Sequence, residues 1–119
     1  MEQNCRVLQI MNSFDDVGRY VMNWCRSMNH DRVQFDALIL GEGDPTLEDE
    51  ICSYGGQVLR LASSPADGFF SFRSACKDFF KQHRATYTAI HAHTPYGADT
   101  YMKYAYRANA QVIAHAHTR

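Results

Sequence analysis

The 119-residue sequence lacks the features of several large functional classes. No apolar run approaches the roughly 20 residues that cross a bilayer, and no secretory signal precedes the apolar residues 6–11. No block of Lys or Arg is present, because 12 basic and 13 acidic residues are spread through the chain and give a formal charge of -1. These absences argue against a membrane-spanning, secreted or nucleic-acid-binding protein. We therefore expect a cytoplasmic domain with no nucleic-acid partner.

Motifs for metal, redox and dinucleotide chemistry are also missing. The four cysteines, Cys5, Cys25, Cys52 and Cys76, form no Cys-x-x-Cys pair, so a zinc knot or a thiol redox site has no support. Cys25 and Cys76 lie on the apolar stripes of expected helices, where free cysteine packs as a small hydrophobe. No Gly-x-Gly-x-x-Gly follows the first expected strand, which leaves a nicotinamide or flavin role with little support. A Ser, Thr or Cys nucleophile elbow is absent as well.

Short apolar runs alternate with segments of helical spacing along the whole chain. The apolar fraction of 45% over 119 residues predicts one compact domain, 1–119, with a hydrophobic core. Strands are expected at residues 6–11, 33–40, 57–61, 86–90 and 111–114. Helices are expected after the capping Asp15-Asp16, after the capping Asp44, over residues 69–83 and over residues 97–108. The first helix carries the expected apolar stripe Val17, Tyr20, Val21, Trp24, Cys25 and Met28.

Strands separated by helices of about ten to fifteen residues imply right-handed βαβ crossovers. We therefore predict an α/β fold, a Rossmann-like three-layer α/β/α arrangement with a mostly parallel sheet of about five strands in the order 3-2-1-4-5. In that order the chain reverses direction between the first and fourth strands. A crevice should open there, between the loop after Met11 and the loop after His93, and ligands bind at such crevices in open α/β sheets.

Two His-x-His pairs follow the fourth and fifth expected strands. They are His91 with His93, and His115 with His117. Residues i and i+2 of a strand face the same side, so each pair can present two imidazoles together where the chain leaves the sheet. We expect His93 at the crevice and His91 one step deeper, as a hydrogen-bonded structural histidine.

Two other classes of function remain open from the residues. Imidazoles two apart on a strand can chelate one divalent ion, so the pairs could serve a metal-dependent hydrolase. Such a site would normally add carboxylates from other strand ends, and only Asp99, inside the last helix, lies close in sequence. The remaining alternative is a stand-alone Rossmann-like binding or regulatory domain with no enzymatic activity.

Five segments, in order and at natural spacing, resemble the N-terminal half of glycosyltransferase family 4. They are RVLQIMNSF (6–14), VQFD (33–36), GGQVLRL (55–61), YTAIHAH (87–93) and VIAHAHTR (112–119). The resemblance implies a retaining GT-B enzyme that needs no metal, with two Rossmann-like domains facing a cleft. This chain would be the acceptor-side domain, and the nucleotide-sugar donor would bind the C-terminal domain, which this chain does not include.

The resemblance also implies a function and partners. The parent enzyme would move a sugar to a glycan or lipid-linked acceptor, as in capsule or exopolysaccharide assembly, and the isolated chain would be inactive. The expected partners are that acceptor and the C-terminal domain of the same protein, and the chain holds no cofactor of its own. Peripheral contact with the inner face of the membrane and self-association of the isolated chain are further expectations.

Particular residues match the family pattern. His93 matches a histidine that contacts sugar hydroxyls near the transferred group and is the expected catalytic residue. Gly18 matches one of two glycines in the first strand–helix loop, while Val17 replaces the other and puts close phosphate contact in question. His117 matches a histidine that shapes the acceptor pocket. Arg19 and Tyr96 are expected beside the same pocket, and no metal ligand is implied.

Overall fold

Strands and helices alternate along the chain. The computed structural model describes residues 5–12, 16–94, 96–108 and 111–114. In chain order the elements are β1 (Cys5–Met11), α1 (Asp16–Ser27), β2 (Val33–Ile39), α2 (Pro45–Ser53), β3 (Val58–Leu59), the 3₁₀ turn η1 (Pro65–Asp67), α3 (Phe69–Gln82), β4 (Ala89–Ala92), α4 (Ala98–Arg107) and β5 (Gln111–Ala114).

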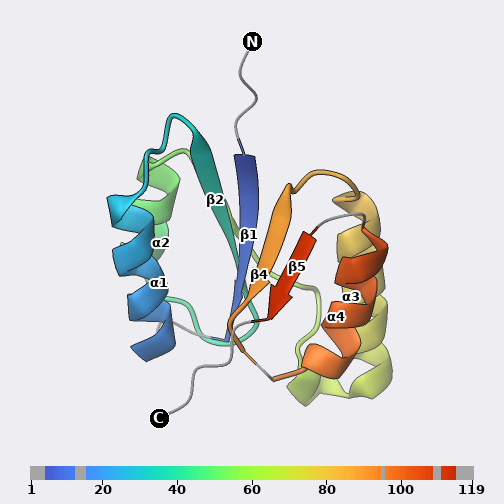
Figure 1. Cartoon of the computed structure of the whole chain (residues 1–119). Coiled ribbons are helices and arrows are strands. Elements are labelled where there is room, and N and C mark those ends of the chain that lie inside the picture. The colour runs from blue at the N-terminus through green and yellow to red at the C-terminus, as the bar shows by residue number, and fades with distance from the viewer. Residues whose placement is uncertain (1–4, 13–15, 95, 109–110, 115–119) are drawn as a thin grey trace.

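The five strands form one parallel sheet in the order β3-β2-β1-β4-β5. Helices α1 and α2 cover one face of this sheet, and α3 and α4 cover the other (Figure 1). The predicted α/β fold and strand order are therefore confirmed. In this order β1 lies between β2 and β4, and the register places Gln9 of β1 beside His91 of β4.

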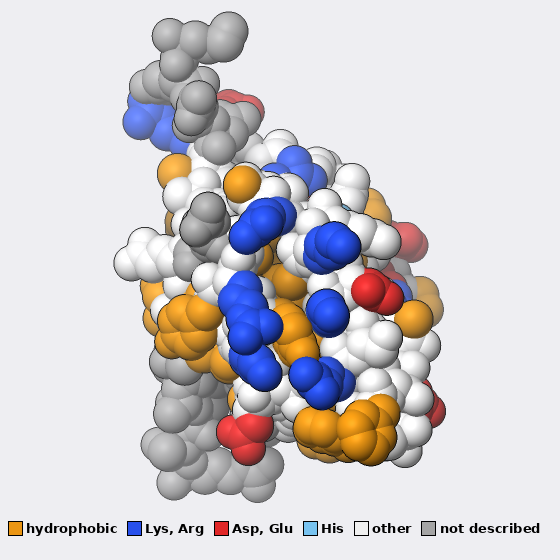
Figure 2. All heavy atoms as spheres, turned by 90° about the vertical axis from the view of Figure 1, so that its right-hand side faces the viewer, with side chains coloured by type: hydrophobic (Ala, Val, Ile, Leu, Met, Phe, Trp, Pro, Cys, Tyr) orange, Lys and Arg blue, Asp and Glu red, His pale blue; other side chains and the backbone are white. Residues whose placement is uncertain are grey.

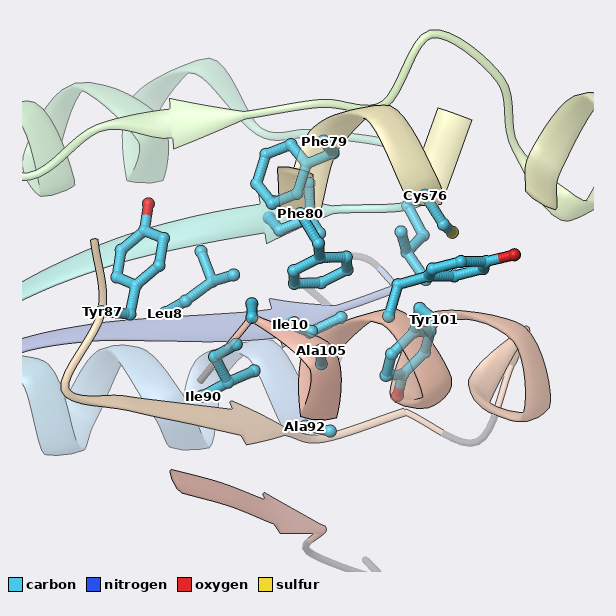
Figure 3. Packing of buried hydrophobic residues seen from close by; sticks show 14 of the residues in the cluster. Leu8, Ile10, Cys76, Phe79, Phe80, Tyr87, Ile90, Ala92, Tyr101 and Ala105 are labelled. Carbon is cyan, nitrogen blue, oxygen red and sulfur yellow. The ribbon is translucent and has the colours of Figure 1, made fainter. Parts of the chain in front are cut away.

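The larger hydrophobic core lies between the sheet and helices α3 and α4. Leu8 and Ile10 of β1 and Ile90 of β4 are at most 1% exposed and meet the aromatic side chains of the two helices. Figure 3 shows Phe79, Phe80 and Tyr101 directed toward this face of the sheet. Burial of each large apolar side chain contributes about 1.5–3 kcal/mol, so this cluster holds α3 and α4 in place. A smaller cluster, which includes Met11, Val21, Met22 and Ile39, holds the opposite helices.

Local capping explains where α2 begins and ends. The Asp44 side chain accepts hydrogen bonds from the backbone N–H groups of Thr46 and Leu47, at 3.0 and 3.3 Å. Pro45 occupies the first turn, where its missing N–H is not needed. Gly55, with φ of 91°, lies two residues beyond the last residue of the helix. The predicted cap and stop of this helix are confirmed.

The buried face of α1 differs from the predicted stripe. Val21, Met22 and Cys25 are buried, whereas Tyr20 is 54% exposed and Trp24 is 39% exposed. Met22 was missed because a spacing of three or four residues fits two overlapping faces of one helix, and only packing on the sheet selects between them. Trp24 instead lies at the flank of the helix, with its ring 5.7 Å from Phe35 and 5.6 Å from His91.

β4 begins later than predicted. The strand covers Ala89–Ala92, not residues 86–90, so His91 lies inside the sheet. Residues 83–86 form a turn in which Ala85 has φ of 61° and the Thr86 N–H donates to the His83 carbonyl at 3.0 Å. The start of the strand is set by its pairing with Val7 of β1, a contact 82 residues away that local propensity does not contain.

A buried carboxylate joins three parts of the chain near the amino edge of the sheet. Asp36 of β2 is 1% exposed and accepts hydrogen bonds from the Arg6 guanidinium at 3.0 and 3.3 Å. It also accepts from the Gln57 backbone N–H at 2.9 Å and from the Tyr87 hydroxyl at 2.8 Å. Burial and the bond to Asp36 raise the pKa of Tyr87, and the same carboxylate raises the pKa of Arg6. The network ties β1, β2 and the start of β4 together.

The four thiols should divide into two reactive and two protected groups. Cys5 and Cys52 are exposed, whereas Cys25 and Cys76 are buried. Burial raises the pKa of Cys25 to about 11 and that of Cys76 to about 12, so almost no thiolate exists there at neutral pH. Titration with a chromogenic disulfide reagent should modify Cys5 and Cys52 quickly and the buried pair only after denaturant is added. Rapid modification of Cys25 or Cys76 in the native protein would contradict this packing.

Candidate functional site

The ends of β1 and β4 lie side by side at the carboxyl edge of the sheet, where ligands bind in this class of fold. β1 ends at Met11 and β4 ends at Ala92, and these two strands are neighbours in the sheet. Helices α1 and α4 both begin at this edge (Figure 1). The chain reversal at which a crevice was predicted therefore lies between β2 and β4, at the end of β1.

His93 is the first residue after β4, and both its backbone and its ring are held by β1. Its N–H donates to the Ile10 carbonyl at 2.9 Å, which extends the strand pairing by one residue. The His93 side chain is 2% exposed, and its Nε2 lies 2.5 Å from Oε1 of Gln9. An amide oxygen only accepts, so this contact requires a proton on Nε2. Gln9 therefore holds the His93 ring in one orientation and selects its Nε2–H form.

Gln9 carries a buried donor with no partner among the described residues. Gln9 is 2% exposed, its Oε1 accepts from His93, and its Nε2 makes no hydrogen bond to any described residue. A buried N–H group left without an acceptor costs about 1–3 kcal/mol, so such groups are rare in folded proteins. Sequence reasoning missed Gln9, although a polar residue inside the apolar run 7–11 was a usable signal.

His91 lies between His93 and α1. Its ring centroid is 4.0 Å from that of His93, and the edge of Trp24 meets it at 5.6 Å. His91 lies inside β4, one step further from the carboxyl edge than His93 as predicted, but it is half-buried whereas His93 is almost fully buried. The pair nevertheless shares one face of the strand, as the i, i+2 spacing predicts.

The residues expected in the first loop lie in the first turn and a half of α1. Gly18 is buried, and Arg19 directs its side chain outward and is exposed. The helix begins at Asp16, so the N-terminal N–H groups of α1 lie at the carboxyl edge, where a helix end favours negative charge.

The loop after His93 is fixed by hydrogen bonds and by close packing. The Tyr101 hydroxyl donates to the Thr94 carbonyl, and the Tyr96 N–H donates to Thr94 Oγ1 at 3.1 Å. Tyr96 itself is 41% exposed at the carboxyl edge. Gly97 has φ of 74°, and a Cβ there would lie 2.8 Å from the Phe72 ring, so only glycine fits before α4.

A hollow of about 180 Å³ lies at the same edge, beyond β2 and β3. It is bordered by Gly41, by Arg60 and by the loop that contains Ser63 and Ser64. Its charged groups are paired, since Arg60 bonds Glu48 at 2.9 and 3.0 Å and Asp67 accepts from the Ser64 N–H at 2.8 Å. This hollow was not identified from the sequence.

The chain is similar to one curated protein over most of its length. It is 29% identical over 93 residues to "Putative glycosyltransferase EpsF" of Bacillus subtilis (strain 168), which covers 76% of this chain. The match spans 24% of the EpsF sequence, so the chain corresponds to about a quarter of that relative. No protein-family model matches the chain. The similarity to EpsF is therefore distant and partial.

The described part of the chain contains no ligand set for the metal-dependent hydrolase alternative. No three His, Cys, Asp or Glu side chains among these residues come together in a way that could hold an ion. His115 and His117 lie outside the described residues. Both histidines belong to the metal-site hypothesis, and the expected acceptor pocket also includes this pair. A separate observation is that no helix among the described residues is long and apolar enough to span a bilayer.

Proposed function

We propose that this chain is the acceptor-side domain of a retaining GT-B glycosyltransferase. The parent enzyme would move a sugar from a nucleotide-sugar to a glycan or lipid-linked acceptor, as in capsule or exopolysaccharide assembly. The observation that carries this proposal is the buried Gln9–His93 pair at the reversal point of a parallel sheet, where Gln9 keeps an unused donor. The distant similarity to EpsF supports the same class of chemistry.

Polar groups at the edge match the needs of sugar recognition. A neutral imidazole offers one donor and one acceptor, and an amide N–H adds a donor, which suits the hydroxyl groups of a sugar. We assign His93 the contact closest to the transferred group, with Gln9 as the residue that orients its ring. In this proposal Gly18 and Arg19 border the site from α1 and Tyr96 borders it from the loop before α4. His117, which lies outside the described residues, would complete the acceptor pocket.

The transfer itself requires a second domain. The acceptor oxygen forms a bond to the anomeric carbon, the bond from that carbon to the diphosphate oxygen breaks, and the proton of the acceptor hydroxyl passes to the departing diphosphate. Negative charge develops on the departing diphosphate, and basic side chains and helix N-termini of the second domain would stabilise it. The isolated chain is therefore expected to bind no nucleotide-sugar and to transfer no sugar.

The burial of His93 sets the strength of binding that we expect. A side chain that is 2% exposed meets a ligand only after the edge opens, and the free energy of opening lowers the observed affinity. Carbohydrate binding by the isolated chain should therefore be weak, and a method that detects weak binding is needed.

Two-dimensional ¹H–¹⁵N NMR of the labelled chain tests this proposal. Glucose, galactose and N-acetylglucosamine are titrated singly, and UDP and UDP-glucose are titrated in parallel. At least one free sugar should shift signals of Gln9, His91 and His93 in a saturable way, whereas UDP and UDP-glucose should shift none. Tight uptake of UDP-glucose, or sugar-dependent shifts confined to residues far from the carboxyl edge, would overturn the proposal.

A further inference from the structure

A hollow lies on the outer side of α3 and α4, away from the carboxyl edge. Its volume is about 250 Å³, and it is bordered by Lys77, Phe80, Lys81, Arg84, Tyr104, Arg107 and Ala108. Figure 2 shows this side of the molecule, where basic side chains gather around a strip of apolar side chains. We call the surface formed by Arg73, Lys77, Lys81, Arg84, Lys103 and Arg107, with Phe80 and Tyr104, the α3–α4 face.

Helical spacing concentrates positive charge on this face. Residues 69–84 and 98–107 carry six basic residues and two acidic ones, Asp78 and Asp99, in a chain whose net charge is -1. Phe70, Arg73, Lys77, Lys81 and Arg84 follow one another at steps of three or four residues. Steps of that size place side chains on one stripe of a helix, so α3 presents a line of cations that begins with the Phe70 ring and is followed by Arg84 in the turn after the helix.

Tyr104 organises the cations of α4 and α3 around one ring. Its hydroxyl accepts from Arg73 Nε at 2.9 Å, and this bond to a cation lowers the pKa of Tyr104. Lys103 Nζ lies 5.7 Å from the ring centroid, and Arg107 Cζ lies 5.6 Å from it. These distances lie within the range of cation–π attraction. The face is thus a structured surface with its charges held in place.

The basic residues of this face differ from three arginines elsewhere in the fold. Arg6, Arg26 and Arg60 are each paired with a carboxylate, at 3.0, 2.6 and 2.9 Å. Within the described residues, no carboxylate forms an ion pair with any of the six cations of the α3–α4 face. Their charge is consequently available to an external anionic partner.

Apolar side chains at the start of α3 indicate which anionic partner fits. Phe69 is 61% exposed and Phe70 is 78% exposed, with their rings in edge contact at 5.3 Å. A basic surface bordered by exposed aromatic residues matches a bilayer, because cations contact anionic headgroups while the rings enter the boundary with the acyl chains.

Other anionic partners fit less well. A second copy of the chain would have to offer an acidic surface. In the acid-rich helix α2, however, Glu48 is already paired with Arg60 and Glu50 with Arg26. A nucleic acid would use the cations without needing two adjacent exposed phenylalanines at the end of the stripe. We propose that the α3–α4 face docks the protein onto an anionic phospholipid bilayer, with Lys77, Lys81, Arg84 and Arg107 on the headgroups and Phe69 and Phe70 at the lipid boundary.

Flotation of the 119-residue chain with two kinds of vesicle tests this proposal. One kind contains phosphatidylcholine alone, and the other contains equal parts of phosphatidylcholine and phosphatidylglycerol. The chain should float with the anionic vesicles only, and added salt should release it. A basic residue close to an anionic surface contributes about 1 kcal/mol, or about fivefold in partitioning, so K77Q/K81Q should lower partitioning by about 25-fold. F69A/F70A should also lower it, with the salt dependence retained.

A charge-matched control separates this face from net charge. R26Q/R32Q removes the same formal charge from α1 and from the loop that follows it, and it should float like the unaltered chain. Equal flotation with neutral vesicles, no flotation with either kind, or equal losses in the two double variants would overturn the proposal. A shift of duplex DNA in a gel that requires Lys77 and Lys81, without vesicle binding, would assign the face to nucleic acid instead. The assay contains no sugar donor or acceptor, so its outcome is independent of the proposed transferase function.

Discussion

Replacement of Asp36 by alanine should destabilise the chain by about 3–5 kcal/mol, the range seen when one partner of a buried pair is removed. The substitution leaves the Tyr87 hydroxyl and the Gln57 N–H without their acceptor inside the protein, and it leaves the Arg6 guanidinium unpaired. A loss of this size is a large share of the total stability of a small domain, which is about 5–15 kcal/mol. Urea unfolding followed by circular dichroism measures the change through its midpoint.

The pair formed by Glu48 and Arg60 provides a matched control for Asp36. Both pairs use two hydrogen bonds between one carboxylate and one arginine, but the Glu48 side chain is 20% exposed and the Asp36 side chain is 1% exposed. Replacement of Glu48 by alanine should therefore cost less than about 1 kcal/mol, because exposed ion pairs contribute little. Equal urea midpoints for the two variants would show that the Asp36 network does not stabilise the fold.

Replacement of His93 by alanine should weaken carbohydrate binding by about tenfold or more. One net hydrogen bond contributes about 0.5–1.5 kcal/mol, and tenfold in affinity corresponds to about 1.4 kcal/mol. The loss includes the disordering of Gln9, whose Oε1 no longer has the His93 Nε2–H to orient it. The measurement is the same NMR titration with free sugars, and the dispersion of the spectrum reports whether the fold is retained.

His83 supplies a matched control for His93. It is a half-buried histidine at the C-terminal end of α3, with its ring 4.5 Å from Phe79, at the opposite edge of the sheet from His93. H83A should leave sugar-dependent shifts unchanged. H93N, which fills part of the space of the ring, covers the case in which H93A loses its fold. Sugar binding by a folded His93 variant at the unaltered affinity would remove His93 from the proposed site.

Local sequence patterns could not predict the polar contacts within the site. Gln9 and His93 lie 84 positions apart, and Asp36 collects donors from Arg6, Gln57 and Tyr87 on three other segments. A polar residue inside an apolar run was visible in both cases, but its partners depend on strand pairing. The α3–α4 face could be predicted only in part. Sequence spacing places Arg73, Lys77, Lys81 and Arg84 on one line, but it does not show that Arg107 lies beside them.

Taken alone, the amino-acid sequence determined the order of strands and helices, the Asp44 cap of α2 and the parallel sheet with β1 between β2 and β4. Those features follow from short-range physics, namely continuous apolar runs, helical spacing, capping groups and the handedness of βαβ units. Only the tertiary structure decided which face of α1 is buried, where β4 begins and that His93 is bonded to Gln9. Each of these depends on which distant side chains compete for the same buried space, and that competition is settled only when the layers pack.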